Sequence, residues 1–162
     1  MDIIGIDVGG VIMDRANDDT DTSFFSDNFL KTTSMPYTVE TVKRLIDLKF
    51  GERAYIVSKC GKNIQDKTMR WLEHHRFYER TGLRPEHVHF CRKREGKAGI
   101  CKELGITHFI DDRLEVLGYL IPYVEHLYLF HPGEDEVNKF RHHLLRVQRV
   151  ENWREVEGLI LG

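Results

Sequence analysis

Four polar features of the sequence each follow a short apolar segment, at the point where a buried strand would end. In chain order they are Asp7, Ser58, Lys97 and the pair Asp111-Asp112. Because the carboxyl ends of parallel strands meet at one edge of a sheet, we expect these side chains to converge. Neighbouring carboxylates need a shared cation, and oxygen ligands favour magnesium. A hydroxyl and an ammonium beside them suit phosphoryl oxygens, and one carboxylate could attack phosphorus.

The elements that must position these residues alternate between strands and helices. The apolar, largely β-branched or aromatic segments predict strands at residues 3–8, 54–58, 87–91, 108–111 and 126–130. Helical spacing of apolar residues predicts helices at residues 38–51, 63–82, 97–104, 112–121, 137–147 and 153–161. Such alternation implies right-handed crossovers between parallel strands. The predicted fold is α/β: a three-layer α/β/α sandwich around a Rossmann-like, mostly parallel sheet of about five strands.

Polar residues before three of these helices are typical of N-caps, whose side chains accept hydrogen bonds from the first turn. Thr38 and Asn63 are predicted to cap the first two helices. Asn152, followed three residues later by Glu155, predicts a capping box at the start of the last one.

Length and composition predict a single domain over residues 1–162. The chain has 162 residues and a net charge of −2, which gives no clear signal for nucleic acid or a membrane surface. Its three cysteines form no CxxC pair, which favours a reducing, cytoplasmic setting. The start of the chain lacks the pattern of a signal peptide. The polar stretch at residues 15–37 is long enough for a flap but not for a cap domain, and covering of the site by a homo-oligomer is an alternative.

The order of these motifs resembles the haloacid dehalogenase-like superfamily, whose members are mostly phosphatases. Asp7-Val8-Gly9-Gly10-Val11 is similar to its first motif, DxDG[TV], and Asp14 matches a further common Asp. Ser58, Lys97 and Asp111-Asp112 match the second, third and fourth motifs. The resemblance implies a magnesium-dependent phosphatase with a phosphorylated substrate of unknown identity. It implies catalytic roles for Asp7, Ser58 and Lys97, with Asp7 as the nucleophile that forms an aspartyl-phosphate.

The same resemblance implies the ligands of the metal and of the substrate. Magnesium would be bound by Asp7, Asp111, Asp112 and the backbone carbonyl of Gly9. The candidate substrate-binding residues are Ser58, Lys59, Lys97 and Gly10. Lys59 and Arg113, which follow Ser58 and Asp112, are both placed to touch a substrate, although charged residues at loop edges are more often only solvated.

One departure from the family pattern bears on activity. The family's second Asp, which protonates the leaving group and later activates water, is Gly9 here. Loss of such help costs roughly 10²–10⁴ in rate. Three outcomes stay open: another acid substitutes, activity is slow and limited to good leaving groups, or the module only binds metal and phosphate. The candidate substitutes are Asp14, Asp18, Asp19, Asp21 and Asp27. Dehalogenases, which hydrolyse carbon–halogen bonds, also lack that Asp, but they typically need a cap domain.

Overall fold

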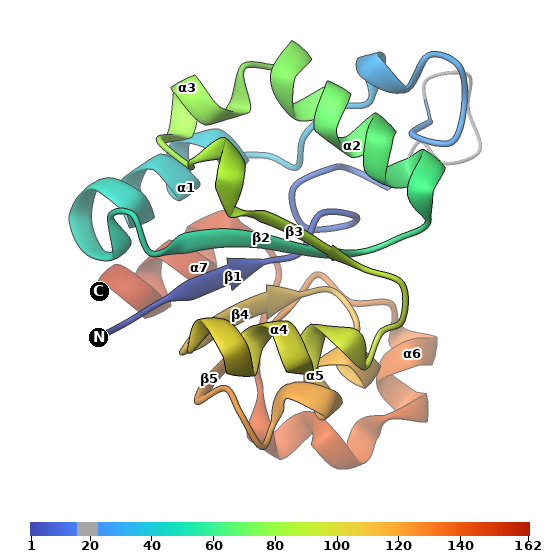
Figure 1. Cartoon of the computed structure of the whole chain (residues 1–162). Helices are drawn as coiled ribbons and strands as arrows, with labels where there is room; N and C mark the ends of the chain where they lie inside the picture. The colour runs from blue at the N-terminus through green and yellow to red at the C-terminus, as the bar shows by residue number, and fades with distance from the viewer. Residues whose placement is uncertain (16–22) are drawn as a thin grey trace.

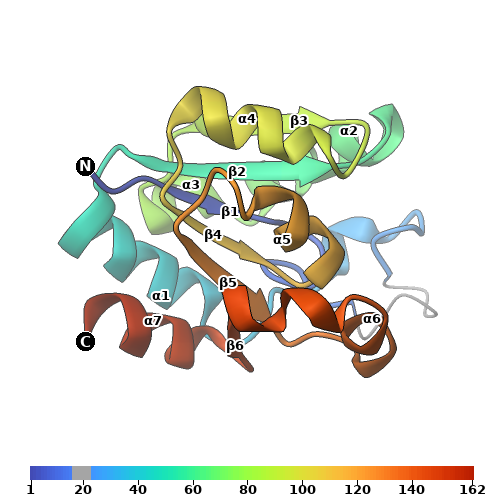
Figure 2. The ribbon, with the colours of Figure 1, turned by 90° about the horizontal axis from the view of Figure 1, so that it is seen from below.

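A six-stranded sheet forms the centre of the molecule, in which every neighbouring pair of strands is parallel. The computed structural model describes residues 1–15 and 23–162. The strand order is β3-β2-β1-β4-β5-β6 (Figures 1 and 2; β6 is labelled in Figure 2). The strands are β1 (Ile4–Ile6), β2 (Ala54–Lys59), β3 (Val88–Cys91), β4 (His108–Asp111), β5 (His126–Phe130) and β6 (Gln148–Val150). The order changes direction at β1, so its carboxyl end opens into a crevice between crossovers that cover opposite faces.

Helices cover both faces of this sheet. They are α1 (Thr38–Leu45), α2 (Lys62–His74), α3 (Phe77–Thr81), α4 (Gly96–Leu104), α5 (Leu114–Leu120), α6 (Glu134–Lys139) and α7 (Trp153–Leu161). Shorter helical segments are η1 (Phe29–Lys31), η2 (Ile46–Phe50), η3 (Pro85–His87) and η4 (Arg141–Arg146). α1, α2, α3 and α7 bury one core against the sheet, and α4, α5 and α6 bury the other (Figures 1 and 2). No helix in the described part is long and apolar enough to cross a membrane.

The predicted α/β/α architecture is confirmed, but the sheet has six strands rather than about five. The helix predicted at residues 137–147 is wrong. That region instead contains the end of α6, the short η4, and the approach to β6. Within the described residues, β6 pairs only with β5, and two of its three residues are exposed. An edge strand this short and polar carries no apolar run, so its sequence gives no strand signal.

Two of the three predicted helix caps are also wrong. Tyr37, with a left-handed φ of 64°, precedes α1, and the hydroxyl of Thr38 donates to the carbonyl of Met35 at 2.6 Å. Gly61 rather than Asn63 precedes α2. The cap of α7 is confirmed, because the Asn152 side chain accepts from the N–H of Glu155 at 3.0 Å. The reciprocal bond differs from a capping box: the Glu155 carboxylate accepts from the N–H of Glu151, at 2.6 Å.

Two buried tryptophan side chains fasten the segments that follow β1. The Trp153 indole donates to the carbonyl of Val11 at 2.9 Å, and the Trp71 indole donates to the carbonyl of Thr32 at 3.0 Å. Between these points, the N–H of Met35 donates to the carbonyl of Ile12 at 2.8 Å. The loop after β1 and the return from the polar stretch are therefore held to the core by two helices, α7 and α2.

His108 is a buried histidine at the amino end of the sheet, where both chain termini also lie (Figure 1). Its ring stacks on His126, with centroids 4.4 Å apart, and meets Phe50 edge-on. Burial, and then the neighbouring His126, lowers the pKa of His108 to about 4. The folded protein therefore keeps this ring neutral at a pH where the unfolded chain protonates it.

We expect this difference in pKa to make the fold sensitive to acid. Stability from a neutral His108 is complete above the unfolded pKa of about 6.5 and is lost as the pH falls towards 4, by roughly 1–3 kcal/mol. Urea unfolding at pH 7 and pH 4.5 measures the loss. His108→Phe should lose less stability over that interval than the wild type, whereas the exposed-site control His74→Gln should follow the wild type. Equal losses in all three proteins would contradict the expectation.

Candidate active site

Lys97 lies at the centre of a buried group of charges at the carboxyl ends of β1 and β4. Its ammonium donates to Oδ1 of Asp7 and to Oδ2 of Asp111, both at 2.8 Å. The Lys97 side chain is 3% exposed. Asp7, Asp111 and Asp112 each offer a carboxylate oxygen, and these oxygens lie within 4.8 Å of one another. The structure therefore brings together four of the residues that the sequence analysis selected.

The sheet register explains why residues so distant in the chain meet. Ile6 pairs with Ile110 across β1 and β4, and the N–H of Asp7 donates to the Ile110 carbonyl at 3.0 Å. Asp7 and Asp111 thus leave neighbouring strands at the same level. α4 follows β3 and carries Lys97 in its first turn, back across the end of the sheet. A buried ammonium and two buried carboxylates satisfy one another there, which neither could do alone.

Burial shifts the protonation of the two acids at the end of β4. It raises the pKa of Asp111 to about 6, and the negative charge of Asp7 adds to that effect while Lys97 opposes it. Burial, followed by Asp7 and Asp111, also raises the pKa of Asp112 well above its ordinary range. One ammonium therefore does not fully compensate three carboxylates. A divalent cation would remove the remaining repulsion, and an all-oxygen donor set fits magnesium.

The loop after β1 brings glycine against the third carboxylate. Gly10 has a left-handed φ of 79°, and a β-carbon placed there would overlap the carboxylate of Asp112. The carbonyl of Val8 accepts from three successive N–H groups, those of Val11, Ile12 and Met13, which closes the loop into a tight turn. Gly10 therefore supplies both the backbone conformation and the space that let Asp112 approach β1.

A second set of bonds fixes the segment that carries Asp112. Oδ1 of Asp111 accepts from the N–H of Arg113 at 3.0 Å. The two carboxylate oxygens of Glu136, from α6, accept from the N–H groups of Leu114 and Glu115 at 2.8 and 2.9 Å. Because these N–H groups open α5, a carboxylate caps that helix from a neighbouring element. The backbone that follows the pair Asp111-Asp112 is therefore held by Asp111 itself and by Glu136.

A cavity of about 310 Å³ opens above these charges. Ser58, which is 6% exposed, and Lys59 line it from the end of β2, and Gly9 lines it from the loop after β1. Gly10 is not among the lining residues, so its role in substrate binding stays a prediction. Asp14 also lines the cavity and Asp27 does not, whereas Asp18, Asp19 and Asp21 lie outside the described residues.

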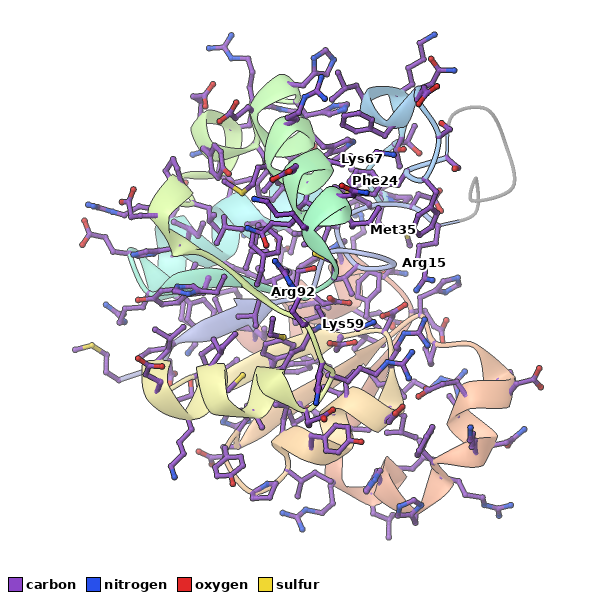
Figure 3. All side chains as sticks on the ribbon, turned by 45° about the vertical axis from the view of Figure 1, so that its right-hand side comes forward. Arg15, Phe24, Met35, Lys59, Lys67 and Arg92 are labelled. Carbon is purple, nitrogen blue, oxygen red and sulfur yellow. The ribbon has the colours of Figure 1, made fainter. Side chains whose placement is uncertain are left out.

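The floor of the cavity is formed by Asp7, Lys97, Asp111 and Asp112, and side chains of two kinds lie above it. Its cations include Arg15, Arg94 and Arg113, and its apolar side chains include Phe24 and Phe25. Arg15, Phe24 and Lys59 come from three separate segments and can be followed in Figure 3. Arg15 is one of the lining residues that the sequence analysis did not select. It lies at the edge of a polar stretch with no periodicity, and only its place beside Asp14 could have drawn attention to it.

Among the comparisons with known proteins, the one with solved structures identifies the fold. No family model and no curated protein matches the chain. Among solved structures, D,D-heptose 1,7-bisphosphate phosphatase from Burkholderia thailandensis has a TM-score of 0.63 at 15% identity, covering 100% of this chain and 99% of that one. The corresponding enzyme from B. bronchiseptica, complexed with magnesium and phosphate, has a TM-score of 0.59 at 17% identity, covering 99% and 98%.

A third similar structure is the cobalt-bound form of deoxy-D-mannose-octulosonate 8-phosphate phosphatase from Haemophilus influenzae. It has a TM-score of 0.58 at 16% identity, covering 99% of this chain and 87% of that one. All three cover nearly the whole chain. At these identities the likeness shows the fold: the chain has the haloacid dehalogenase-like fold that its motifs resemble.

Proposed function

We propose that this protein is a magnesium-dependent phosphohydrolase without a cap domain that acts on phosphomonoesters through an aspartyl-phosphate. The observation that carries the proposal is the Lys97 ammonium held 2.8 Å from both Asp7 and Asp111, with Asp112 beside them, at the floor of a cavity. The likeness to three phosphatases supports the same reaction class. The three free cysteines support a cytoplasmic setting, and the phosphorylated substrate stays unidentified.

Each side chain at the floor has a role that its position supports. Asp7, whose Oδ1 is held by Lys97, presents its other carboxylate oxygen as the nucleophile towards phosphorus. The Lys97 ammonium and the Ser58 hydroxyl would bind the phosphoryl oxygens and stabilise the charge that develops on them. Lys59 and the loop at Gly10 would bind the remaining substrate oxygens.

The donor set at the floor fits magnesium, which we propose as the cofactor. Asp7, Asp111, Asp112 and the backbone carbonyl of Gly9 would hold it. When bound, the ion would supply charge neutralisation for the phosphoryl group and for the three carboxylates. The magnesium complex of the B. bronchiseptica phosphatase supports this choice.

The decisive experiment is hydrolysis of 4-nitrophenyl phosphate with and without magnesium. Asp7→Asn should lower the magnesium-dependent rate at least 10³-fold, because the amide is no nucleophile although it still accepts the Lys97 hydrogen bond. Asp135→Asn, an exposed acid of α6, is the matched control and should keep the wild-type rate. A wild type and an Asp7→Asn variant that are equally inert on a panel of phosphate esters would end the enzymatic proposal.

The absence of a side chain at Gly9 favours a second candidate function, a module that binds metal and phosphate without turnover. Magnesium or inorganic phosphate should then raise the melting temperature of the protein by mass action while no phosphate ester is hydrolysed. Asp112→Asn should remove the magnesium-dependent part of that shift. Turnover that depends on Asp7 would exclude this second candidate.

A further inference from the structure

The side chain of Arg15 lies next to position 9, where the family resemblance puts an acid. A β-carbon built on Gly9 would have Cδ of Arg15 as its nearest neighbour, at 3.8 Å, and one built on Gly10 would lie 3.2 Å from the same atom. Gly9 is not in the left-handed region, so its backbone does not require glycine. The missing side chain at Gly10 leaves room for the methylene stem of Arg15, whereas at Gly9 the stem would make only an ordinary contact with a β-carbon.

The charged end of Arg15 reaches the edge of the carboxylate group. Nη1 of Arg15 lies 3.5 Å from Oδ2 of Asp112, and the side chain is 41% exposed and lines the cavity. Arg15 therefore lies on the open side of the floor, whereas Lys97 lies on the buried side, and a phosphoryl group bound at the floor would have a cation on each side. A leaving group would have to pass from the floor through the cavity that Arg15 lines.

We infer that Arg15 stabilises the leaving group as an anion, so that the substrate class is phosphates whose leaving groups need no proton. The inference rests on the proposed function and specifies its substrate. Carboxylates and phosphates leave readily as anions, and a guanidinium binds both in a planar, charge-assisted manner. Acyl phosphates and phosphoanhydrides are therefore the substrates that this site fits, and simple alkyl phosphates are not.

The chemistry balances without an acid at position 9. An oxygen of Asp7 forms a bond to phosphorus, and the bond from phosphorus to the leaving oxygen breaks, with its electron pair leaving on that oxygen beside Arg15. Water then adds to the phosphorus and the bond to the Asp7 oxygen breaks, which restores the Asp7 carboxylate. One proton of the water stays on the released phosphate, and the other passes to another phosphate oxygen or to solvent. Since no carboxylate at position 9 takes that proton, the second step is slower than the first.

Two measurements test the inference. In steady state, acetyl phosphate should be hydrolysed with a kcat/KM at least about 10² times that for glycerol 3-phosphate. In single turnovers, substituted phenyl phosphates should react faster as the phenol becomes more acidic. Arg15→Gln should lower the rates about 10- to 100-fold, most for the least acidic phenols, and so steepen this dependence. Arg15→Lys should recover much of the loss.

Arg94→Gln is the matched control, because Arg94 lines the same cavity but is held by Glu115 at 2.7 Å. It should change KM at most and leave the dependence on phenol acidity as in the wild type. Equal rates for acetyl and glycerol phosphates, or an Arg15→Gln variant with the wild-type dependence, overturns the inference while the proposed function stands. The inference is also overturned by an Asp14→Asn variant that abolishes a fall in rate at high pH, because Asp14 would then be the acid that protonates the leaving group. If no phosphate is hydrolysed in a way that depends on Asp7, the proposed function itself is overturned.

Discussion

Lys97→Met is expected to lower the free energy of unfolding by about 3–5 kcal/mol at pH 8, because it leaves buried carboxylates with no paired cation. The ammonium contacts Asp7 and Asp111 at 2.8 Å, and its own pKa is raised by those two charges against the effect of burial. Methionine retains the length of the stem, so the effect isolates the lost charge. Urea unfolding measures it, with the exposed Lys102→Met on the same helix as the control.

The size of this effect should depend on pH. Without Lys97, which lowers the pKa of Asp111, the folded-state pKa of Asp111 lies further above its unfolded value. A carboxyl with a raised folded pKa costs stability as the pH rises through that value, so the variant should be closest to the wild type near pH 5 and furthest from it at pH 8. A loss below about 1 kcal/mol at pH 8, or a loss that grows with acidity, would contradict the role given to Lys97.

Gly9→Asp is expected to raise the rate of glycerol 3-phosphate hydrolysis by about 10²-fold, because it supplies a proton to a poor leaving group. The structure accommodates the substitution: the backbone at Gly9 is not left-handed, and the nearest atom to the new β-carbon, Cδ of Arg15, is at an ordinary 3.8 Å. Magnesium-dependent release of phosphate measures the rate, and Gly9→Asn, which has the same shape but no acid, is the matched control.

The same substitution should leave acetyl phosphate hydrolysis little changed in its first step, since a carboxylate leaving group needs no proton. It should speed the second step, because the new carboxylate can accept a proton from water. A Gly9→Asp variant no faster than Gly9→Asn on glycerol 3-phosphate would mean that a side chain at position 9 does not reach the leaving group.

The floor of the site could be predicted from the sequence because its residues stand at fixed places relative to strong strand signals. Asp7 and Asp111 each follow a run of buried apolar residues, and parallel neighbours end at the same edge. Lys97 was placed by its position at the start of a helix. In each case a local pattern determined the element, and the topology rule then placed the side chain.

The residues that could not be predicted depend on contacts between distant segments. β6 is held in place by pairing with β5, and its exposed Gln148 and Arg149 carry no strand pattern. Thr38 forms a hydrogen bond to Met35 instead of capping a helix, because the N-cap position is taken by the preceding Tyr37, whose φ of 64° is left-handed. Arg15 acquires its position from the tight loop after β1, where its stem passes Gly10, and no local pattern in the sequence indicates that contact.

The hydrogen bonds of the two indole rings allow the intrinsic fluorescence of the protein to report on the site. The chain contains two tryptophans, and each one is hydrogen-bonded to a backbone carbonyl. One carbonyl is that of Val11, between the lining residues Gly9 and Met13, and the other is that of Thr32, further along the chain from the lining residue Phe25. A substrate or an ion that tightens or loosens either segment changes the surroundings of one indole, and with them the wavelength of its emission. Binding to this site can therefore be followed in solution by intrinsic fluorescence, without an added dye, and Trp71→Phe separates the two signals.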